Sequence, residues 1–162
     1  MKKQTIITAA GLVVIIAASI LIIGGLPGSE PPGLTVSNEY GSKISAQRGT
    51  YSWKPNLSTS VEADSAGPLY LYSLGELRGI EPSENDDYSL SLKFDNAPQS
   101  VTVVIYPESA AATEDYGAMI LRSVSGIASG YMFTVPSDGI YIVNVLATWS
   151  KGECYYYFYT TP

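Results

Sequence analysis

One uncharged segment constrains the architecture of this 162-residue chain more than any other feature. Lys2 and Lys3 precede a run from Thr5 to Leu26 that holds no ionisable side chain, and the next ionisable group is Glu30. A helix over residues 5–26 is ~33 Å long, enough to cross a bilayer hydrocarbon core of ~30 Å. We therefore expect a transmembrane signal-anchor helix over residues 5–26, preceded by a cytoplasmic stub of residues 1–4.

A cleaved secretory signal is the alternative for this segment. Such signals carry an apolar region of about 7–15 residues and a cleavage site with small residues at two positions. Cleavage after Ser19 would leave residues 20–23 (Ile-Leu-Ile-Ile) in water, and cleavage after Gly25 would use a site with bulky Ile23 at its first position. Because the lysines precede the run and the acidic residues follow it, the N-terminus is expected in the cytoplasm. The chain is then a single-pass protein of the cell membrane with an extracytoplasmic C-terminal domain, or a secreted protein if the signal is cleaved.

Charge and residue types narrow the possible functions of the part beyond the anchor. The whole chain has a formal net charge of −6, of which Lys2 and Lys3 contribute +2, so the outer part carries −8. A field of this sign disfavours nucleic acid and anionic lipid surfaces as partners. The chain has no histidine, the commonest general base and metal ligand, and it has no phosphate-binding or dinucleotide-binding glycine motif. We therefore expect no enzyme activity, no cofactor and no metal.

The chain beyond residue 33 alternates apolar and polar side chains with the period of a β-strand. Residues 88–94 and 101–105 show this pattern, and the turn residues between them predict a hairpin. Residues 131–136, 141–149 and 154–158 repeat it, with turns at 137–139 and 150–152. Weaker strands are predicted at 34–38, 45–53, 58–64, 69–72 and 118–122, a short helix from 110–113, and one helical turn within 74–80. Short strands separated by turns are typical of an all-β antiparallel sandwich, which we expect over residues 34–162.

Proline and glycine residues join the expected anchor to this domain. Residues 27–33 contain Pro27, Pro31 and Pro32 together with Gly28 and Gly33. Proline favours an extended, semi-rigid chain. We expect residues 27–33 to be a linker that acts as a short stalk.

A set of spaced residues resembles a known class of bacterial domains. Its members in this chain are Gly49-Thr50-Tyr51-Ser52-Trp53, Ala63-Asp64-Ser65, Pro68-Leu69, Pro136, Gly139, Tyr141, Ala147, Trp149, Gly152, Tyr156 and Phe158. The order is similar to that in membrane-anchored extracytoplasmic immunoglobulin-like domains of unknown function from Firmicutes. The resemblance implies an immunoglobulin-like β-sandwich outside the cytoplasmic membrane and supplies no catalytic residues. Some such domains are lipoproteins or are fused to membrane metallopeptidases, but this chain has neither the lipid-attachment cysteine nor a peptidase part.

Aromatic side chains are the best binding candidates in the sequence. Tyr155, Tyr157 and Tyr159 share the strand face opposite Cys154 and would form an open strip for a glycan or peptide. The strip is alternatively covered by a loop, by a partner or by the segment 107–130. Trp53 and Trp149 could stack on sugar rings, although tryptophan in a sandwich is more often a core residue.

Two further groups of residues have a structural interpretation that we prefer. Cys154 alternates with Tyr156 and Phe158 and is expected to be a buried thiol, with a cross-link between two chains as the alternative. The acidic residues Glu81, Glu84, Asp86 and Asp87 lack the spacing of a calcium loop and are expected to form a solvated turn.

These observations favour a non-catalytic, membrane-anchored extracytoplasmic binding or sensing domain whose ligand, a protein or a glycan, the sequence does not identify. The alternative is a structural or envelope-assembly protein that acts through protein–protein contacts of the sandwich, for example by strand addition at an open edge. An enzyme is the least favoured class.

Overall fold

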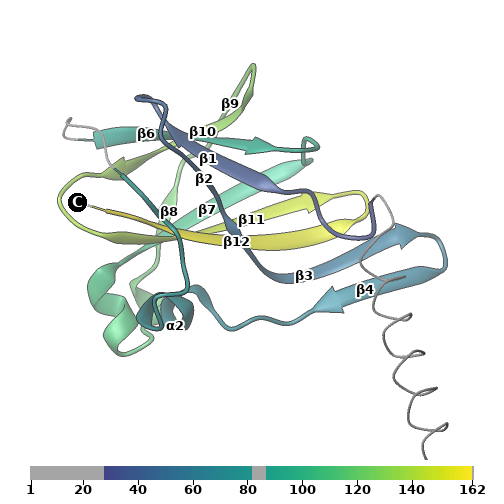
Figure 1. Cartoon of the computed structure of the whole chain (residues 1–162), viewed down its shortest axis with the longest axis horizontal. Coiled ribbons are helices and arrows are strands. Elements are labelled where there is room, and N and C mark those ends of the chain that lie inside the picture. The colour runs from purple at the N-terminus through teal and green to yellow at the C-terminus, as the bar shows by residue number, and fades with distance from the viewer. Residues whose placement is uncertain (1–27, 82–86, 162) are drawn as a thin grey trace, which may run out of the picture.

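The computed structural model describes residues 28–81 and 87–161, which form two β-sheets packed face to face (Figure 1). The first sheet has the order β2 (Lys43–Ser45), β1 (Leu34–Asn38), β6 (Asp87–Phe94), β10 (Gly130–Pro136) and β9 (Ser125–Ile127). The second has the order β4 (Thr59–Ala63), β3 (Gln47–Asn56), β12 (Gly152–Thr160), β11 (Tyr141–Trp149), β7 (Ser100–Pro107) and β8 (Ile120–Arg122). The short strand β5 (Gly79–Ile80) runs parallel to β12, and the other pairs are antiparallel. The all-β sandwich is thus confirmed.

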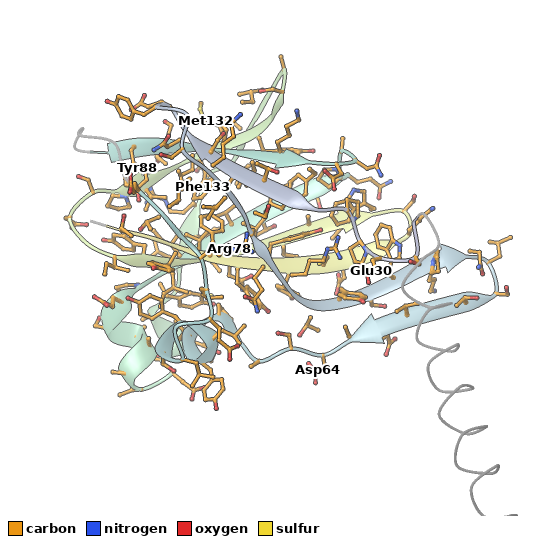
Figure 2. All side chains as sticks on the ribbon, in the orientation of Figure 1. Glu30, Asp64, Arg78, Tyr88, Met132 and Phe133 are labelled. Carbon is orange, nitrogen blue, oxygen red and sulfur yellow. The ribbon has the colours of Figure 1, made fainter. Side chains whose placement is uncertain are left out.

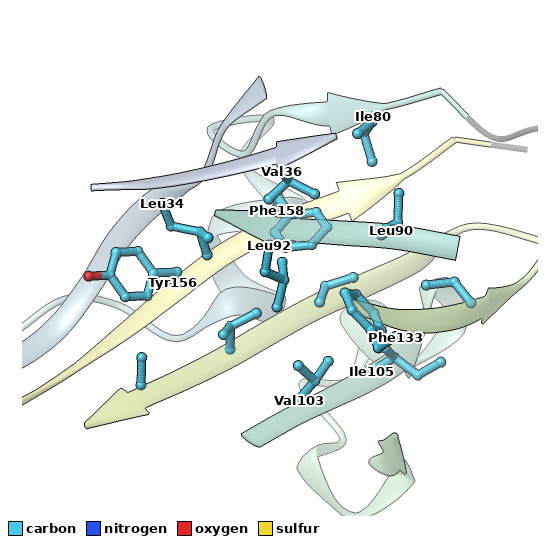
Figure 3. Close-up of a cluster of buried hydrophobic side chains, with 14 of the residues drawn as sticks. Leu34, Val36, Ile80, Leu90, Leu92, Val103, Ile105, Phe133, Tyr156 and Phe158 are labelled. Carbon is cyan, nitrogen blue, oxygen red and sulfur yellow. The ribbon is translucent and has the colours of Figure 1, made fainter. Parts of the chain in front are cut away.

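The main core lies between the two sheets (Figure 3). Alternation in β6 buries Tyr88, Leu90 and Leu92, as the period-two pattern predicts. The facing strands contribute Val103 and Ile105 from β7, and β11 and β12 add further fully buried side chains. Burial of one face of each strand removes large apolar side chains from water and stabilises the stacking of the two sheets.

The hairpin predicted between residues 88–94 and 101–105 is wrong. β6 pairs with β1 and β10, whereas β7 pairs with β11 and β8 in the opposite sheet. The connection between them is held at its two ends by different sheets, because Asp95 N donates to Gly33 O and Gln99 N donates to Thr148 O. Alternation fixes which face of a strand is buried, but it does not encode the partner strand. The turn predicted at residues 150–152, by contrast, is confirmed, and it joins β11 to β12, which pair as a hairpin.

Residues 69–72 form a helix and not the predicted strand. Helix α2 (Pro68–Ser73) has its proline in the first turn, a position where the missing N–H costs nothing. Residues 74–80 do not form the predicted helical turn but lead into β5. The short helix expected near residue 110 is present as the 3₁₀ helix η1 (Glu108–Ala112), which is followed by η2 (Tyr116–Ala118).

These helices create a second core on the outer face of the β12–β11–β7 sheet. It consists of Leu69, Leu71, Leu77, Tyr106, Ala110, Ala111, Ile142 and Tyr157. The helices therefore cover part of a sheet face that would otherwise expose aromatic side chains to water.

Across residues 28–81 and 87–161, no helix is long and apolar enough to cross a bilayer. The anchor predicted for residues 5–26 and the stub of residues 1–4 lie outside the described residues.

Helix α2 offers a direct test of the second core. Leu69→Ala removes a side chain that is fully buried, and should lower the free energy of unfolding by ~2–5 kcal/mol. Tyr70→Ala, on the exposed side of the same helix, should change it by no more than ~0.5 kcal/mol. Urea denaturation followed by circular dichroism measures both, and equal effects of the two substitutions would contradict the packing of α2 on the sheet.

Candidate ligand-binding site

The described part of the linker, residues 28–33, lies against one end of the sandwich. Pro31 and Pro32 are buried. Trp53 Nε1 donates to the carbonyl of Gly28 over 3.0 Å, and the Tyr156 hydroxyl donates to the carbonyl of Pro32. Residues 28–33 of the expected linker therefore pack against the folded domain.

An aromatic cluster that includes Trp53 and Tyr156 lies next to the linker. The Trp53 and Trp149 rings meet edge to face with their centroids 5.6 Å apart, and Phe94 meets Trp149 in the same way at 5.7 Å. Phe94 also packs edge to face on Tyr156 at 5.7 Å and on Tyr131 at 6.0 Å. Each such pair contributes ~0.5–1.5 kcal/mol beyond the area that it buries. The rings thus form a rigid base for the end of the sandwich.

The two tryptophans differ in what they can offer to a ligand. Trp53 is only 4% exposed, so its ring faces are not open to a sugar, in line with the core role preferred from the sequence. Trp149 is half-buried, and its Nε1 donates to the carbonyl of Asn96 over 3.1 Å. Trp149 is therefore the ring that a ligand could touch.

A groove of about 640 Å³ opens between the linker and this end of the sandwich. Its lining residues are Gly28, Ser29, Glu30, Pro31, Pro32, Gly33, Arg48, Trp53, Asp95, Asn96, Trp149, Ser150 and Lys151. The volume falls in the range of small-molecule sites, ~300–1,000 Å³. Glu30, which lies near the end from which the β3–β4 hairpin projects, marks the position of the groove (Figure 2).

The charged groups of the groove differ in how far they are already engaged. Glu30 forms an ion pair with Arg48, and Asp95 Oδ2 accepts from the Gly33 amide over 2.9 Å. Lys151 is exposed and has no ion pair among the described residues, and its Nζ would lie 3.9 Å from a β-carbon on Gly28. Lys151 is therefore the charged group that is most available to an anionic or polar ligand.

Trp53 and Trp149 of the spaced sequence pattern line this groove, and two glycines of the same pattern lie on the paired strands β12 and β3. Gly152 has φ +146° and pairs with Trp53, and a β-carbon there would lie 2.0 Å from the Ser52 carbonyl oxygen. Gly49 likewise faces the Tyr157 ring, which a β-carbon would approach to 2.2 Å. The glycines thus allow β3 to pair closely with β12, which brings Trp53 beside Trp149. Sequence reasoning singled out the tryptophans but missed Arg48, Asp95 and Lys151, which carry no local motif.

The tyrosine strip of β12 is covered and does not form an open face. Tyr157 is 4% exposed and belongs to the second core, while Tyr155 and Tyr159 are half-buried beside it. The Tyr159 ring packs on Tyr72 of α2 at 5.2 Å. Burial raises the pKa of Tyr157 to about 12. One alternative considered for the strip was that residues 107–130 cover it. This is correct in part, because η1 lies in that segment, but α2, which lies outside it, supplies the rest of the cover.

Cys154 is a buried thiol, and the acidic turn is described only in part. Cys154 is fully buried, and burial raises the pKa of its thiol to about 11. Among residues 28–81 and 87–161, no group of three or more Cys, Asp or Glu side chains could hold a metal ion. Glu84 and Asp86 of the predicted acidic turn lie outside the described residues.

Comparison with known proteins adds no relative: no family model, no curated protein and no solved structure matches this chain.

The burial of Cys154 has a measurable consequence. Because the thiolate is the reactive form and a raised pKa suppresses it, the native protein should not react with a maleimide at neutral pH. The same reagent should label one thiol per chain after denaturation. Rapid labelling of the native protein, or a dimer that dissociates on reduction, would contradict the buried thiol.

Proposed function

We propose that this chain is a non-catalytic, membrane-anchored extracytoplasmic binding or sensing domain, and that the groove beside residues 28–33 is its ligand site. The observation that carries the proposal is the composition of the groove, which combines the half-buried Trp149 ring with the Lys151 ammonium and the Arg48–Glu30 pair. A ring with adjacent charged and hydrogen-bonding groups suits a polar ligand with an apolar face, such as a glycan or a short peptide.

We infer further that the sandwich is immunoglobulin-like. In that fold, strands A, B, E and D form one sheet and strands C, F and G the other, with an additional C′ strand beside C in variable-type domains. Strands β1, β6, β10 and β9 follow the first arrangement, and β8, β7, β11 and β12 follow the order C′, C, F and G. Strands β2 to β5 and helix α2 would then be an insertion between A and B. Tyr141 at the start of β11 donates its hydroxyl to Asp138 Oδ1 over 2.7 Å, a contact similar to the tyrosine corner of that fold.

The state of the potentially reactive side chains supports a non-catalytic role. The carboxylates of Glu30 and Asp95 already bind Arg48 and the Gly33 amide. Cys154 is buried and protonated, and the chain has no histidine to act as a general base. Ligand binding, unlike acid–base catalysis, does not require any of these groups to gain or lose a proton.

The predicted anchor gives the groove a location. Gly28 lines the groove and follows Leu26, the last residue of the predicted anchor, by only two residues. Two residues span at most ~7 Å, so the groove would lie at the extracytoplasmic surface of the membrane that holds the anchor. The ligand proposed here is therefore an envelope glycan or a protein segment that is presented at that surface.

The groove is tested by screening the full chain in lipid nanodiscs against arrays of bacterial envelope glycans and peptides. Lys151→Ala should weaken a hit about 10-fold or more, because a hydrogen bond to a charged group is worth ~1.5–3 kcal/mol. Lys43→Ala, an exposed lysine on β2, should bind like the unaltered chain. A hit that neither Lys151→Ala nor Trp149→Phe weakens would place the ligand elsewhere.

A second candidate function, envelope assembly through a protein partner, is favoured by one observation. Strand β8 is an edge of the second sheet, and Met119, Ile120 and Leu121 at this edge are exposed by 61%, 41% and 70%. An open edge with apolar side chains is suited to strand addition by a partner.

A photocrosslinking residue at position 121 tests this candidate in membranes. We expect a discrete adduct at position 121 if the edge binds a partner, and none at position 40, which is exposed at the β1–β2 turn. Crosslinks at both sites, or at neither, would argue against a partner on the β8 edge.

A further inference from the structure

A fully exposed leucine sits at the tip of the β3–β4 hairpin. Leu57 and Ser58 form the turn between Asn56 and Thr59, and Asn56 Oδ1 accepts from both the amide and the hydroxyl of Ser58 over 3.0 Å. The polar neighbours satisfy the turn without any help from Leu57. The leucine side chain therefore contributes to no core and projects from the domain.

The β3–β4 hairpin projects from one end of the sandwich (Figure 1), and Gly28 lies at this end because it lines the groove there. Trp53 Nε1 binds the Gly28 carbonyl, and Leu57 follows Trp53 by four residues along the hairpin. At ~3.3 Å per residue, the tip reaches ~13 Å beyond Trp53. The tip thus extends past the point at which the chain enters the domain.

The predicted anchor ends two residues before Gly28, so Gly28 would lie within ~7 Å of the hydrocarbon boundary. The headgroup region on each side of a bilayer is about 5–8 Å thick. The end of the domain that carries Gly28 must then face the bilayer, since the folded body cannot overlap the lipid. A hairpin that extends past Gly28 at this end reaches the headgroup layer.

Two free cations lie toward the base of the hairpin. Lys54 and Lys151 are exposed, and the amide of Lys54 donates to the carbonyl of Lys151 over 2.7 Å, which holds β3 beside the turn between β11 and β12. Neither lysine has an ion pair among residues 28–81 and 87–161. Glu153, the acidic residue nearest to them on β12, pairs with Ser52 and lies further from the tip. At this end Glu30 is paired with Arg48, and Asp95 accepts from the Gly33 amide. The ammonium groups of Lys54 and Lys151 therefore remain available to an anion, with Glu153 beside them.

We propose that Leu57, Lys54 and Lys151 form a membrane-contact surface that binds the bilayer carrying the anchor. The leucine enters the boundary between headgroups and acyl chains, and the two ammonium groups bind lipid phosphates. The acidic remainder of the domain is repelled from an anionic surface, which favours the same orientation. The contact rests on the anchor that is part of the proposed function, and it holds the groove at the height of the lipid headgroups.

The test uses the full chain in vesicles of equal parts phosphatidylglycerol and phosphatidylcholine. Leu57→Cys is labelled with a polarity-sensitive fluorophore, and since Cys154 is buried the label reports one site. Tyr40→Cys is the matched control, because Tyr40 is 62% exposed in the β1–β2 turn, away from the linker end of β1. We expect blue-shifted emission at position 57 that lipid-borne quenchers reduce and iodide does not, and the reverse at position 40.

Charge-reversal substitutions test whether the lysines contribute to the membrane contact. Lys54→Glu with Lys151→Glu should shift the emission of the label at position 57 toward its value in water, whereas Lys43→Glu, near the opposite turn, should leave it unchanged. Pure phosphatidylcholine vesicles should give a smaller blue shift than the anionic vesicles.

The outcomes distinguish the contact from the anchor. If the chain floats with the vesicles but the label at position 57 behaves like that at position 40, the membrane contact is overturned and the anchor stands. If the chain does not float with the vesicles, the anchor and the contact are both overturned. A blue shift at position 57 that lipid-borne quenchers do not reduce would indicate a protein contact and overturn the proposal.

Discussion

The docking of residues 28–33 onto the sandwich is the constraint on which the arrangement of this end depends. The buried Tyr156 hydroxyl binds the Pro32 carbonyl, and Trp53 binds the Gly28 carbonyl. These contacts require β3 and β12 to pair closely, which the absence of a β-carbon at Gly152 allows. Without the linker in place, the indole N–H of Trp53 and the hydroxyl of Tyr156 would lose their acceptors. The groove would also lose one wall.

The second core explains how one sheet can be rich in tyrosine and still lack an open aromatic face. β12 carries side chains on both faces that are removed from water: Tyr156 and Phe158 point into the main core, and Tyr157 points into the second. The cover comes from α2 and η1, which are distant in sequence from each other and from β12. The side chains that remain accessible to a ligand, Trp149 and Lys151, therefore lie at the end of the sandwich and not on this sheet face.

The sequence predicted local structure well and long-range relations poorly, for identifiable reasons. Alternation over residues 88–94 assigned the buried face of β6, but its pairing depends on β1 and β10, which no local signal specifies. Leu69-Tyr70-Leu71-Tyr72 has period two and strand-favouring residues, and only Pro68 signalled a helix start. The groove brings together Gly33 with Asp95 and Pro32 with Tyr156, pairs separated by 62 and 124 positions. Charged residues without a motif, such as Lys151, acquire a role only through such contacts.

The way in which the linker is held bears on whether the domain would switch on binding. A ligand can shift an equilibrium only by its difference in affinity for two states. Here Trp53, Tyr156 and Asp95 already hold the linker by hydrogen bonds, and the fixed φ of Pro31 and Pro32 lowers the entropy that docking costs. A ligand in the groove would therefore reinforce a state that is already favoured. If the chain is the membrane-anchored binding domain proposed above, this geometry suits a rigid holder, and a signal would have to arise from what the ligand brings to the membrane surface rather than from a change of fold.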